Sequence, residues 1–483
     1  MSLQLFLQGK ILGVEQFLLA SSGDMDGRSH WVALLSEVLP RALLAELGLS
    51  RMLLGSSGGD QFLVVLPAEA QSLAEQFLSA ASSHMQELSG GQLKLLWAST
   101  ENLGDWSDVR KRLNEEVQRK FGAPGVAAGS TFEPFVQPAT AAASDYFEQV
   151  LGANLRDVPS VGWSPEAPAR IEPGTGKHTW PLSGASDGIP YARHTSLEDD
   201  SSGPASLSTL ASRAGGSPIW GVLRGDVDNI GIRLRRAQSI EEHIQLSVMY
   251  KQFFAGELEV LCSLPDFWQK VSLIYTGGDD FAVYGAWDAL IALAREVQRV
   301  FHRFAEENLK EFPGPEGKTV TMAIALARES GAGLPTIFEE AGQNLAAAKA
   351  AGKDCLHLFG RTLEWKHVPD AAETKTTMAR MINEFGCSPQ FLFELAGFYR
   401  ERQGRRGRND RVERPWRFHR RLNSVIVTPH LGRARSKEFQ RLRADLVSDF
   451  TGKNAAQIRL RPAGRVALEW ARLEAGQAFP ERS

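Results

Sequence analysis

The sequence predicts an α+β protein in which a β-α-β-β-α-β unit occurs twice and is followed by a helical domain. Three observations in the 483-residue chain lead to this prediction. Two segments share the order strand, Gly-Gly-Asp turn, strand and long helix; a stretch rich in Pro, Gly, Ser and Ala separates them; and the last part of the chain is basic and helical in pattern. We therefore expect four regions, at residues 1–121, 122–216, 217–362 and 363–483.

The composition narrows the class of protein. A hydrophobic content of 43% and a charged content of 23% are ordinary for a globular chain, and a net charge of -3 gives no overall attraction to nucleic acid. The three cysteines, Cys262, Cys355 and Cys387, are far apart, so the sequence shows neither a zinc ribbon nor a disulfide framework, and we expect no zinc. No apolar run approaches the length of a membrane span, which predicts a cytoplasmic protein without a membrane partner.

The duplication is visible in two stretches. The first is "MLLGSSGGDQFLVVLPAEAQSLAEQFLSAASSHM" and the second is "SLIYTGGDDFAVYGAWDALIALAREVQRVFHRF". A helix precedes each of them, and in the second copy Leu246, Met249 and Phe253 share one face of that helix. Residues 122–216 between the copies are a connector with few ordered pieces.

The second copy can be completed from its periodicity. Residues 219–225 form an apolar strand, and residues 319–327 alternate as a strand does. A helix with small and apolar residues facing inward ends at Gly352, and residues 354–360 form a last strand. The order is β-α-β-β-α-β with an extra helix and strand, which is the ferredoxin-like arrangement.

The turn Gly277-Gly278-Asp279-Asp280 is the candidate site. Taken alone it is a simple hairpin tip with a solvated pair of carboxylates, because glycine tolerates the turn geometry. In a ferredoxin-like sheet, however, the first strand lies beside this hairpin, and that strand ends in "LRGDVDNIG" with Asp226. Converging carboxylates repel one another unless a cation joins them, and Mg²⁺ or Mn²⁺ prefers such oxygens. Two such ions support phosphoryl transfer, and the glycines allow a phosphate chain to approach the backbone.

Two further residues are candidates for the same site. Lys349 lies late in the small-residue helix, where its ammonium either neutralises the phosphates of bound ATP or is simply solvated. Asn229 follows the first-strand aspartates and either reads a nucleotide base or caps the turn. Asp228 is interpreted as a structural residue.

The pair DVDNIG and GGDDF, in a chain with two such units, resembles the large subunit of type III CRISPR effector complexes. The details are closer to the Csm-like than to the Cmr-like branch. That family has a palm domain related to the GGDEF diguanylate cyclases, and it converts ATP to cyclic oligoadenylate or a related adenylate messenger when its complex binds target RNA. The resemblance covers nearly the whole chain, from "GKILGVEQFLL" and "SSGGDQF" in the first palm to the C-terminal helices.

The resemblance assigns roles to the candidate residues. It implies that Asp226 and Asp280 are the principal metal ligands, that Asp279 assists and that the carbonyl of Val227 contacts a metal. It also implies partners: guide RNA and target RNA, a Cas5-like subunit, a Cas11-like small subunit and backbone subunits. Gly277 and Gly278 would shape the phosphate site.

The sequence departs from the family pattern in three ways. It begins at the first palm and contains no His-Asp dipeptide, so we expect no DNase activity of the HD type. The connector has no cysteines. The first palm is degenerate, with Lys10 roughly where the family often has Asp and with Asp60 alone at its tip, so it either holds the acceptor nucleotide with the residues before Asp60 (Ser57, Gly58 and Gly59) or only completes the pocket.

Three functions remain open on the sequence. The first is a target-activated adenylate cyclase, the second is an inert scaffold that binds guide RNA and other subunits, and the third is a stand-alone cyclic-dinucleotide synthase. The ten arginines between Arg400 and Arg421 either contact RNA or another subunit or form a solvated loop.

Overall fold

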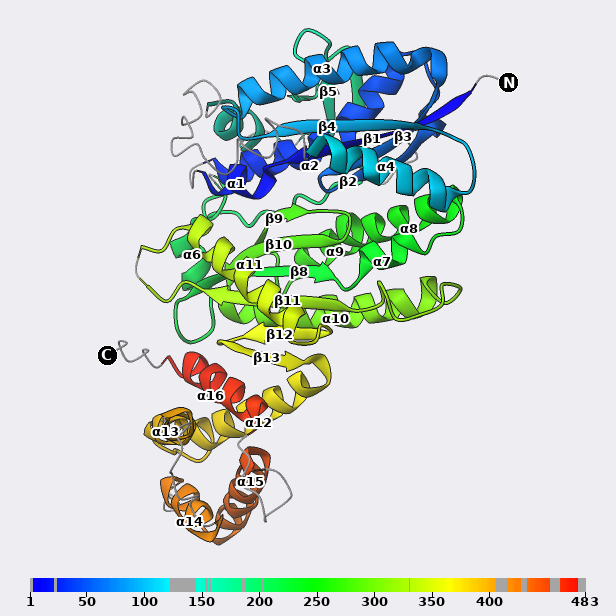
Figure 1. Ribbon diagram of the computed structural model, residues 1–483. Helices are drawn as coiled ribbons and strands as arrows, with labels where there is room; N and C mark the ends of the chain where they lie inside the picture. Colours follow the sequence, from blue (N-terminus) through cyan, green and yellow to red (C-terminus); the bar gives the residue numbers. More distant parts are fainter. Residues whose placement is uncertain are drawn as a thin grey trace.

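Figure 1 shows the computed structural model, in which the two palms lie one above the other and the C-terminal helices extend from the second. The structure describes residues 3–20, 24–121, 145–152, 155, 158–183, 187–201, 203–329, 331–404, 415–426, 432–451 and 461–476. No helix in these ranges is both long and apolar enough to cross a membrane.

The first palm is a four-stranded antiparallel sheet in the order β2-β3-β1-β4. Alternation along β1 sends Leu7 and Ile11 to the face covered by α2 and α3, and sends Phe6 to the face covered by α4. Its elements are β1 (Gln4–Leu12), α1 (Val14–Leu19), α2 (Met25–Glu46), η1 (Arg51–Leu53), β2 (Leu54–Gly58), β3 (Gln61–Pro67), η2 (Ala68–Ala70), α3 (Gln71–Leu88), β4 (Lys94–Glu101) and α4 (Trp106–Phe121).

The described part of the connector is more ordered than the sequence predicts. Trp163 and Phe147 are buried in the core of the first palm, where the indole of Trp31 donates a hydrogen bond to the carbonyl of Ala169. The connector contains a small three-stranded sheet. Composition alone does not predict this sheet, because its strands are very short and a few large apolar residues anchor them. Residues 122–144 lie outside the described ranges. The elements are η4 (Tyr146–Gly152), β5 (Ser160–Trp163), β6 (Glu172–Pro173), β7 (His178–Pro181) and α6 (Leu207–Ser212).

The second palm confirms the predicted ferredoxin-like order. Its sheet runs β13-β12-β11-β8-β10-β9, and both faces are covered, so every residue of β11 is buried. Leu246 and Phe253 are buried on the predicted helix face, with Met249 partly buried beside them. The elements are β8 (Trp220–Val227), α7 (Ile230–Arg235), α8 (Ile240–Gln252), η5 (Phe253–Glu257), α9 (Leu258–Cys262), β9 (Val271–Thr276), β10 (Asp280–Ala286), α10 (Trp287–Asn308), β11 (Val320–Leu326), α11 (Leu334–Ala351), β12 (Cys355–Leu358) and β13 (Arg361–Glu364).

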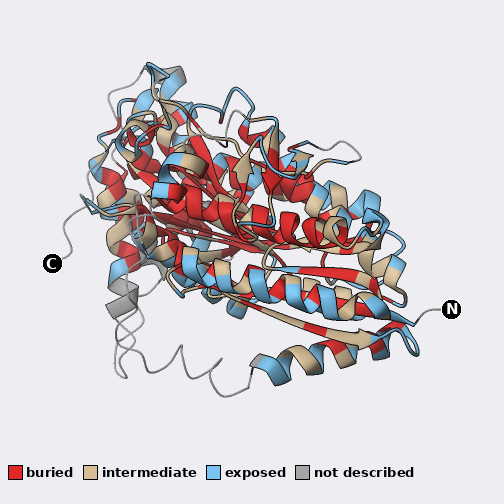
Figure 2. Cartoon of the chain, turned by 90° about the horizontal axis from the view of Figure 1, so that it is seen from above, coloured by how far each residue is buried: buried red, intermediate tan, exposed pale blue. Residues whose placement is uncertain are grey.

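The C-terminal domain is helical, as predicted, and its core is continuous with that of the second palm. Figure 2 shows the buried residues of the chain, in red, gathered in the interior, with exposed residues on the outer faces of the helices. Its last helix returns to the palm, where the backbone N–H of Ser217 donates to the carbonyl of Leu473. Residues 405–414 of the arginine-rich stretch lie outside the described ranges. The helices are η6 (Trp365–His367), α12 (Val368–Asn383), α13 (Gln390–Gly404), α14 (Pro415–Val425), α15 (Arg433–Thr451) and α16 (Pro462–Glu474).

Candidate active site

Antiparallel pairing of β8 with β10 brings the predicted carboxylates together. Asp226 lies directly opposite Asp280 in the register, and the N–H of Val227 donates to the carbonyl of Asp279 at 2.9 Å. The turn closes with the N–H of Gly277 on the carbonyl of Asp280 at 2.7 Å. The two motifs, more than fifty residues apart in the chain, therefore meet at one edge of the sheet.

A cavity of about 480 Å³ lies over these carboxylates and between the palms. The first palm contributes Gly59 and Asp60 to its wall, which places the two Gly-Gly-Asp tips at the same opening. A Cβ added to Gly59 would lie 3.7 Å from the backbone nitrogen of Gly278, so the tips approach each other closely. The lining from the second palm includes Asp226, Gly277, Asp279 and Asp280.

The carboxylates are electrostatically strained. Burial, together with repulsion from Asp280 and Asp226, raises the pKa of Asp279 to about 7. Burial raises the pKa of Asp280 to about 6, although a hydrogen bond from Tyr275 acts in the opposite direction. Burial also raises the pKa of Asp226, whose carboxylate forms an ion pair with Lys349. Lys349 thus supplies the positive charge that this edge of the sheet requires.

The same cavity contains residues that the sequence analysis missed. The hydroxyl of Tyr275 donates to Oδ2 of Asp280 at 2.9 Å, and the guanidinium of Arg224 pairs with Glu15 of the first palm at 3.0 Å. Arg224 also covers the ring of Phe338, 4.3 Å from its centroid. Arg224 could have been found from its sequence position, because it stands two residues before Asp226 and shares its face of the strand.

Other predicted residues lie beside the cavity and not in its wall. Asn229 has a left-handed backbone at the start of α7, and its Oδ1 accepts a hydrogen bond from Lys353. Ser57 donates to Glu37 at 2.8 Å, and the backbone of Gly58 lies against the same carboxylate. A separate role is visible for Asp228, which is buried and accepts hydrogen bonds from two threonine hydroxyls and a backbone N–H (Thr319, Thr321 and Asp354).

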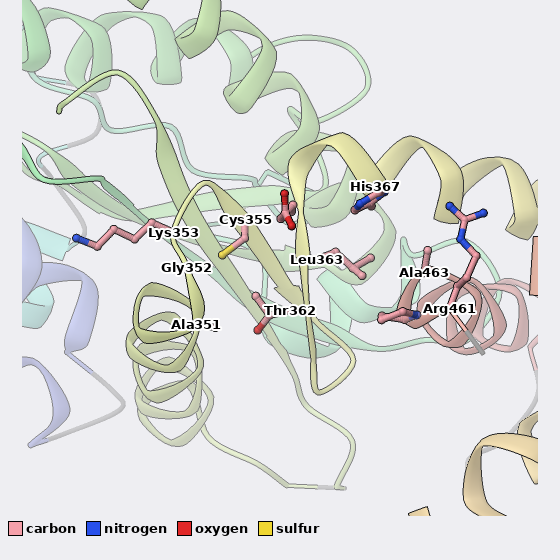
Figure 3. A pocket seen from close by; sticks show the side chains of 11 residues that line it. Ala351, Gly352, Lys353, Cys355, Thr362, Leu363, His367, Arg461 and Ala463 are labelled. Atoms are coloured by element: carbon pink, nitrogen blue, oxygen red, sulfur yellow. The ribbon is translucent and has the colours of Figure 1, made fainter. Parts of the chain in front are cut away.

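A second cavity, of about 370 Å³, lies between the β12–β13 hairpin and the start of α16 (Figure 3). Its lining includes Cys355, His367 and Arg461. Arg461 forms an ion pair with Asp370 at 2.7 Å, and Lys353 extends from this cavity to Asn229. Arg461 and Lys353 of this cavity are therefore engaged with protein groups.

Neutralising Asp279 is expected to stabilise the protein above neutral pH. Its folded pKa of about 7 exceeds the ordinary value of 3.8, so the contribution of Asp279 to the stability of the native state falls as pH rises from about 4 to 7. Above pH 7 none of this contribution is left. Asp279→Asn lacks this loss and should be about 1–2 kcal/mol more stable at pH 8, with the difference shrinking toward pH 4. Thermal unfolding at pH 8 and at pH 4 measures this difference in stability. Asp266→Asn is the control, because Asp266 is exposed. Equal unfolding temperatures at pH 8 would contradict it.

Among the described residues, no group of three or more His, Cys, Asp or Glu side chains is gathered tightly enough to hold a metal ion. The residues present nevertheless fit a divalent cation by chemistry. Among the carboxylates that line the cavity, Asp226, Asp279 and Asp280 have pKa values raised by burial, and Lys349 forms an ion pair with Asp226.

Comparison with known proteins agrees with this description. Residues 219–357 match the family model described as Cas10/Cmr2, second palm domain. A segment of 108 residues is 33% identical to the CRISPR system single-strand-specific deoxyribonuclease Cas10/Csm1 (subtype III-A) of Enterococcus italicus, over 21% of this chain and 14% of that protein. A segment of 187 residues is 25% identical to the protein of the same name from Thermococcus onnurineus, over 35% of this chain and 23% of that protein. The matched segments thus span less than a quarter of these relatives.

Solved structures match over more of the chain. The crystal structure of an apo Csm1-Csm4 cassette has a TM-score of 0.72 at 18% identity, covering 98% of this chain and 70% of that chain. Cassettes in complex with cA3 and with one ATP have TM-scores of 0.68 and 0.67 at 17% and 18% identity, each covering 92% of this chain and 70% of that chain.

The fold and the tip carboxylates define a double-palm protein whose second palm matches the Cas10/Cmr2 second palm domain. Within that class of double-palm proteins, the chain is similar to the Cas10/Csm1 proteins of subtype III-A CRISPR systems, which is the resemblance that its motifs predict.

Proposed function

We propose that this protein is a metal-dependent nucleotidyltransferase that converts ATP to cyclic oligoadenylate, or a related adenylate, inside an RNA-guided complex. The observation that carries the proposal is the register of Asp226 opposite Asp280 in a cavity shared by two palms. The matched cassettes with ATP and cA3 support adenine nucleotides as the substrate class. The cavity is open to both tips, which suits two nucleotides held together.

In the proposed reaction, the 3′-hydroxyl of one ATP attacks the α-phosphate of another. A phosphodiester bond forms, the bond to the β-phosphate breaks, pyrophosphate leaves and the hydroxyl proton is lost to solvent. Asp226, Asp279 and Asp280 would hold Mg²⁺ or Mn²⁺, with the carbonyl of Val227 as a further ligand, and two bound ions would stabilise the charge on the attacking and leaving oxygens. Gly277 and Gly278 leave the backbone open to the phosphates.

The first palm takes the acceptor role in this proposal. Its Asp60 forms an ion pair with Lys10 at 3.4 Å, so its tip carries no free carboxylate cluster. Gly59 nevertheless reaches the cavity, and Ser57 and Gly58 support it from behind. In this proposal the second palm performs the metal chemistry and the first palm positions the acceptor nucleotide.

The proposed partners follow from the relatives. The matched cassettes contain Csm4, and the matched proteins are subtype III-A components. We infer that this chain docks a Cas5-like subunit, a Cas11-like small subunit and backbone subunits, and that guide RNA and target RNA reach it through that assembly.

The test uses the purified complex with guide RNA, labelled ATP and Mg²⁺ or Mn²⁺, with and without matching target RNA. Target-dependent adenylate products that are lost in an Asp279→Ala/Asp280→Ala double variant are the expected result. Product formation by the isolated chain without RNA would instead favour a stand-alone synthase. No ATP consumption with either metal would favour the scaffold.

Lys349→Met is expected to lower kcat/KM for ATP by about 100-fold. The variant removes the ammonium group that pairs with Asp226. In the proposed reaction this same positive charge would contact the triphosphate of ATP. Initial rates over an ATP titration measure the loss. Lys366→Met is the matched control, because Lys366 is exposed, directly follows the last strand of the same palm and pairs with Glu364 of that strand away from the cavity. An equal loss in both variants would contradict a role for Lys349 at the phosphates.

A further inference from the structure

A buried charge cluster joins the two palms directly behind the first-palm tip. Glu37, in the middle of α2, is only 4% exposed. Its Oε1 pairs with Lys251 of α8 in the second palm at 2.6 Å, and its Oε2 pairs with Arg41 at 2.6 Å. Lys251 is also largely buried, with 13% of its side chain exposed. Nothing in the proposed chemistry uses these groups.

The cluster holds the backbone of the tip. Ser57, the second serine of the SSGGD sequence, donates to Oε2 of Glu37 at 2.8 Å and lies 3.3 Å from the ammonium of Lys251. A Cβ on Gly58 would lie 3.2 Å from Oε1 of Glu37, so the tip rests on the carboxylate itself. The adjacent Ser36 donates to the carbonyl of Gly59 at 2.6 Å. Three successive tip residues are therefore fixed to α2.

Lys251 of α8 joins this cluster to the second palm. Helix α8 leads through η5 and α9 to β9, whose far end carries the Gly277-Gly278 turn. One lysine thus ties the tip of the first palm to the body of the palm that carries the carboxylates. Across an interface, a buried ion pair fixes the relative position of two parts more than it adds stability, because desolvation offsets most of the attraction.

We propose that Glu37 and Lys251 form an inter-palm positioning pair that sets the spacing of the two Gly-Gly-Asp tips and so aligns the acceptor nucleotide with the carboxylates of the second palm. This inference rests on the proposed nucleotidyl transfer for its consequence, but the geometry can be tested separately. The pair acts through the hydroxyl of Ser57 and through the packing of Gly58 against Glu37, so Glu37 and Lys251 are positioning residues and not groups that touch the reacting phosphorus.

The test compares the full chain with Lys251→Met and with the double variant Glu37→Gln/Lys251→Met. Lys251→Met breaks the contact between the palms but leaves Glu37 paired with Arg41, whereas the double variant also leaves the largely buried Arg41 without its carboxylate partner. Comparing the two variants separates loss of position from loss of stability. Hydrogen exchange of the peptides 54–62 and 274–282 reports on the tips. We expect exchange in both peptides to become faster by on the order of tenfold in Lys251→Met, while its unfolding temperature stays closer to wild type than that of the double variant.

Binding of a non-hydrolysable ATP analogue supplies the functional readout. The analogue should still occupy one site in Lys251→Met, with the second site weakened about tenfold. Lys270→Met is the control, because Lys270 pairs with Asp288 inside the same palm and remote from the tips, and it should change neither readout. Unchanged tip exchange in Lys251→Met would overturn the positioning pair. Failure of the wild-type protein to bind any analogue would overturn the proposed function. The hydrogen-exchange result would then still test the positioning role of Glu37 and Lys251.

Discussion

Asp280→Asn is expected to reduce nucleotidyl transfer by on the order of a thousandfold or more. The substitution keeps the shape of the side chain and its contact with Tyr275 but removes the charge that lies opposite Asp226 in the register. A cation that needs both carboxylates then binds poorly, and charge developing on the phosphate oxygens is not balanced. The measurement is the rate of adenylate product formation by the assembled complex with target RNA and saturating Mg²⁺.

Asp60→Asn is the matched control for this prediction. Asp60 occupies the corresponding tip of the first palm and lines the same cavity, but it is already paired with Lys10. Its replacement should cost less than about tenfold, because its charge is balanced within the first palm. Equal losses in both variants would mean that the first palm also performs metal chemistry. Full activity of Asp280→Asn would place the reaction elsewhere and favour the scaffold.

Gly277→Ala is expected to lower activity by on the order of a hundredfold without unfolding the protein. A Cβ at this position would lie 2.0 Å from Oδ1 of Asp280, far inside van der Waals contact. The carboxylate is the movable partner, so the clash is relieved by turning Asp280 away from Asp226 and from the hydroxyl of Tyr275. Product formation should therefore fall, while the unfolding temperature changes by a few degrees at most.

Gly256→Ala serves as the control for Gly277→Ala. Gly256 is a glycine of the same palm whose added Cβ meets nothing within 4 Å, so the variant should keep full activity. A crystal structure or carboxyl-sensitive NMR of Gly277→Ala would show whether Asp280 has moved. Wild-type activity of Gly277→Ala would contradict the proposed role of the Asp280 orientation.

Much of the fold was predictable because its signals are local. Alternating residues in 319–327 and the Gly-Gly-Asp turns are encoded in short windows, and β11 and the two hairpins follow them. The position of Asp226 was also predictable, since the ferredoxin-like order places the first strand beside the central hairpin. The β5–β7 sheet was not predictable, because Trp163 and Phe147 find their partners in a core formed by the first palm.

The site was predictable to a smaller extent. The sequence indicated Asp226, Asp279 and Asp280, and the structure places all three at one cavity. It assigned Ser57 to the nucleotide, whereas the structure engages its hydroxyl with Glu37. It gave no sign of Tyr275 as a partner of Asp280, because a tyrosine in an apolar strand has the pattern of a core residue.

The sequence by itself therefore determined the two palms, the order of their strands and the residues that carry the paired carboxylates. Only the tertiary structure decided which charges those carboxylates meet and how the palms are joined. Lys349 on Asp226 and Lys251 on Glu37 are contacts between segments more than a hundred residues apart. Their effect depends on burial, and burial is a property of the packed interface between elements and not of any short stretch of chain.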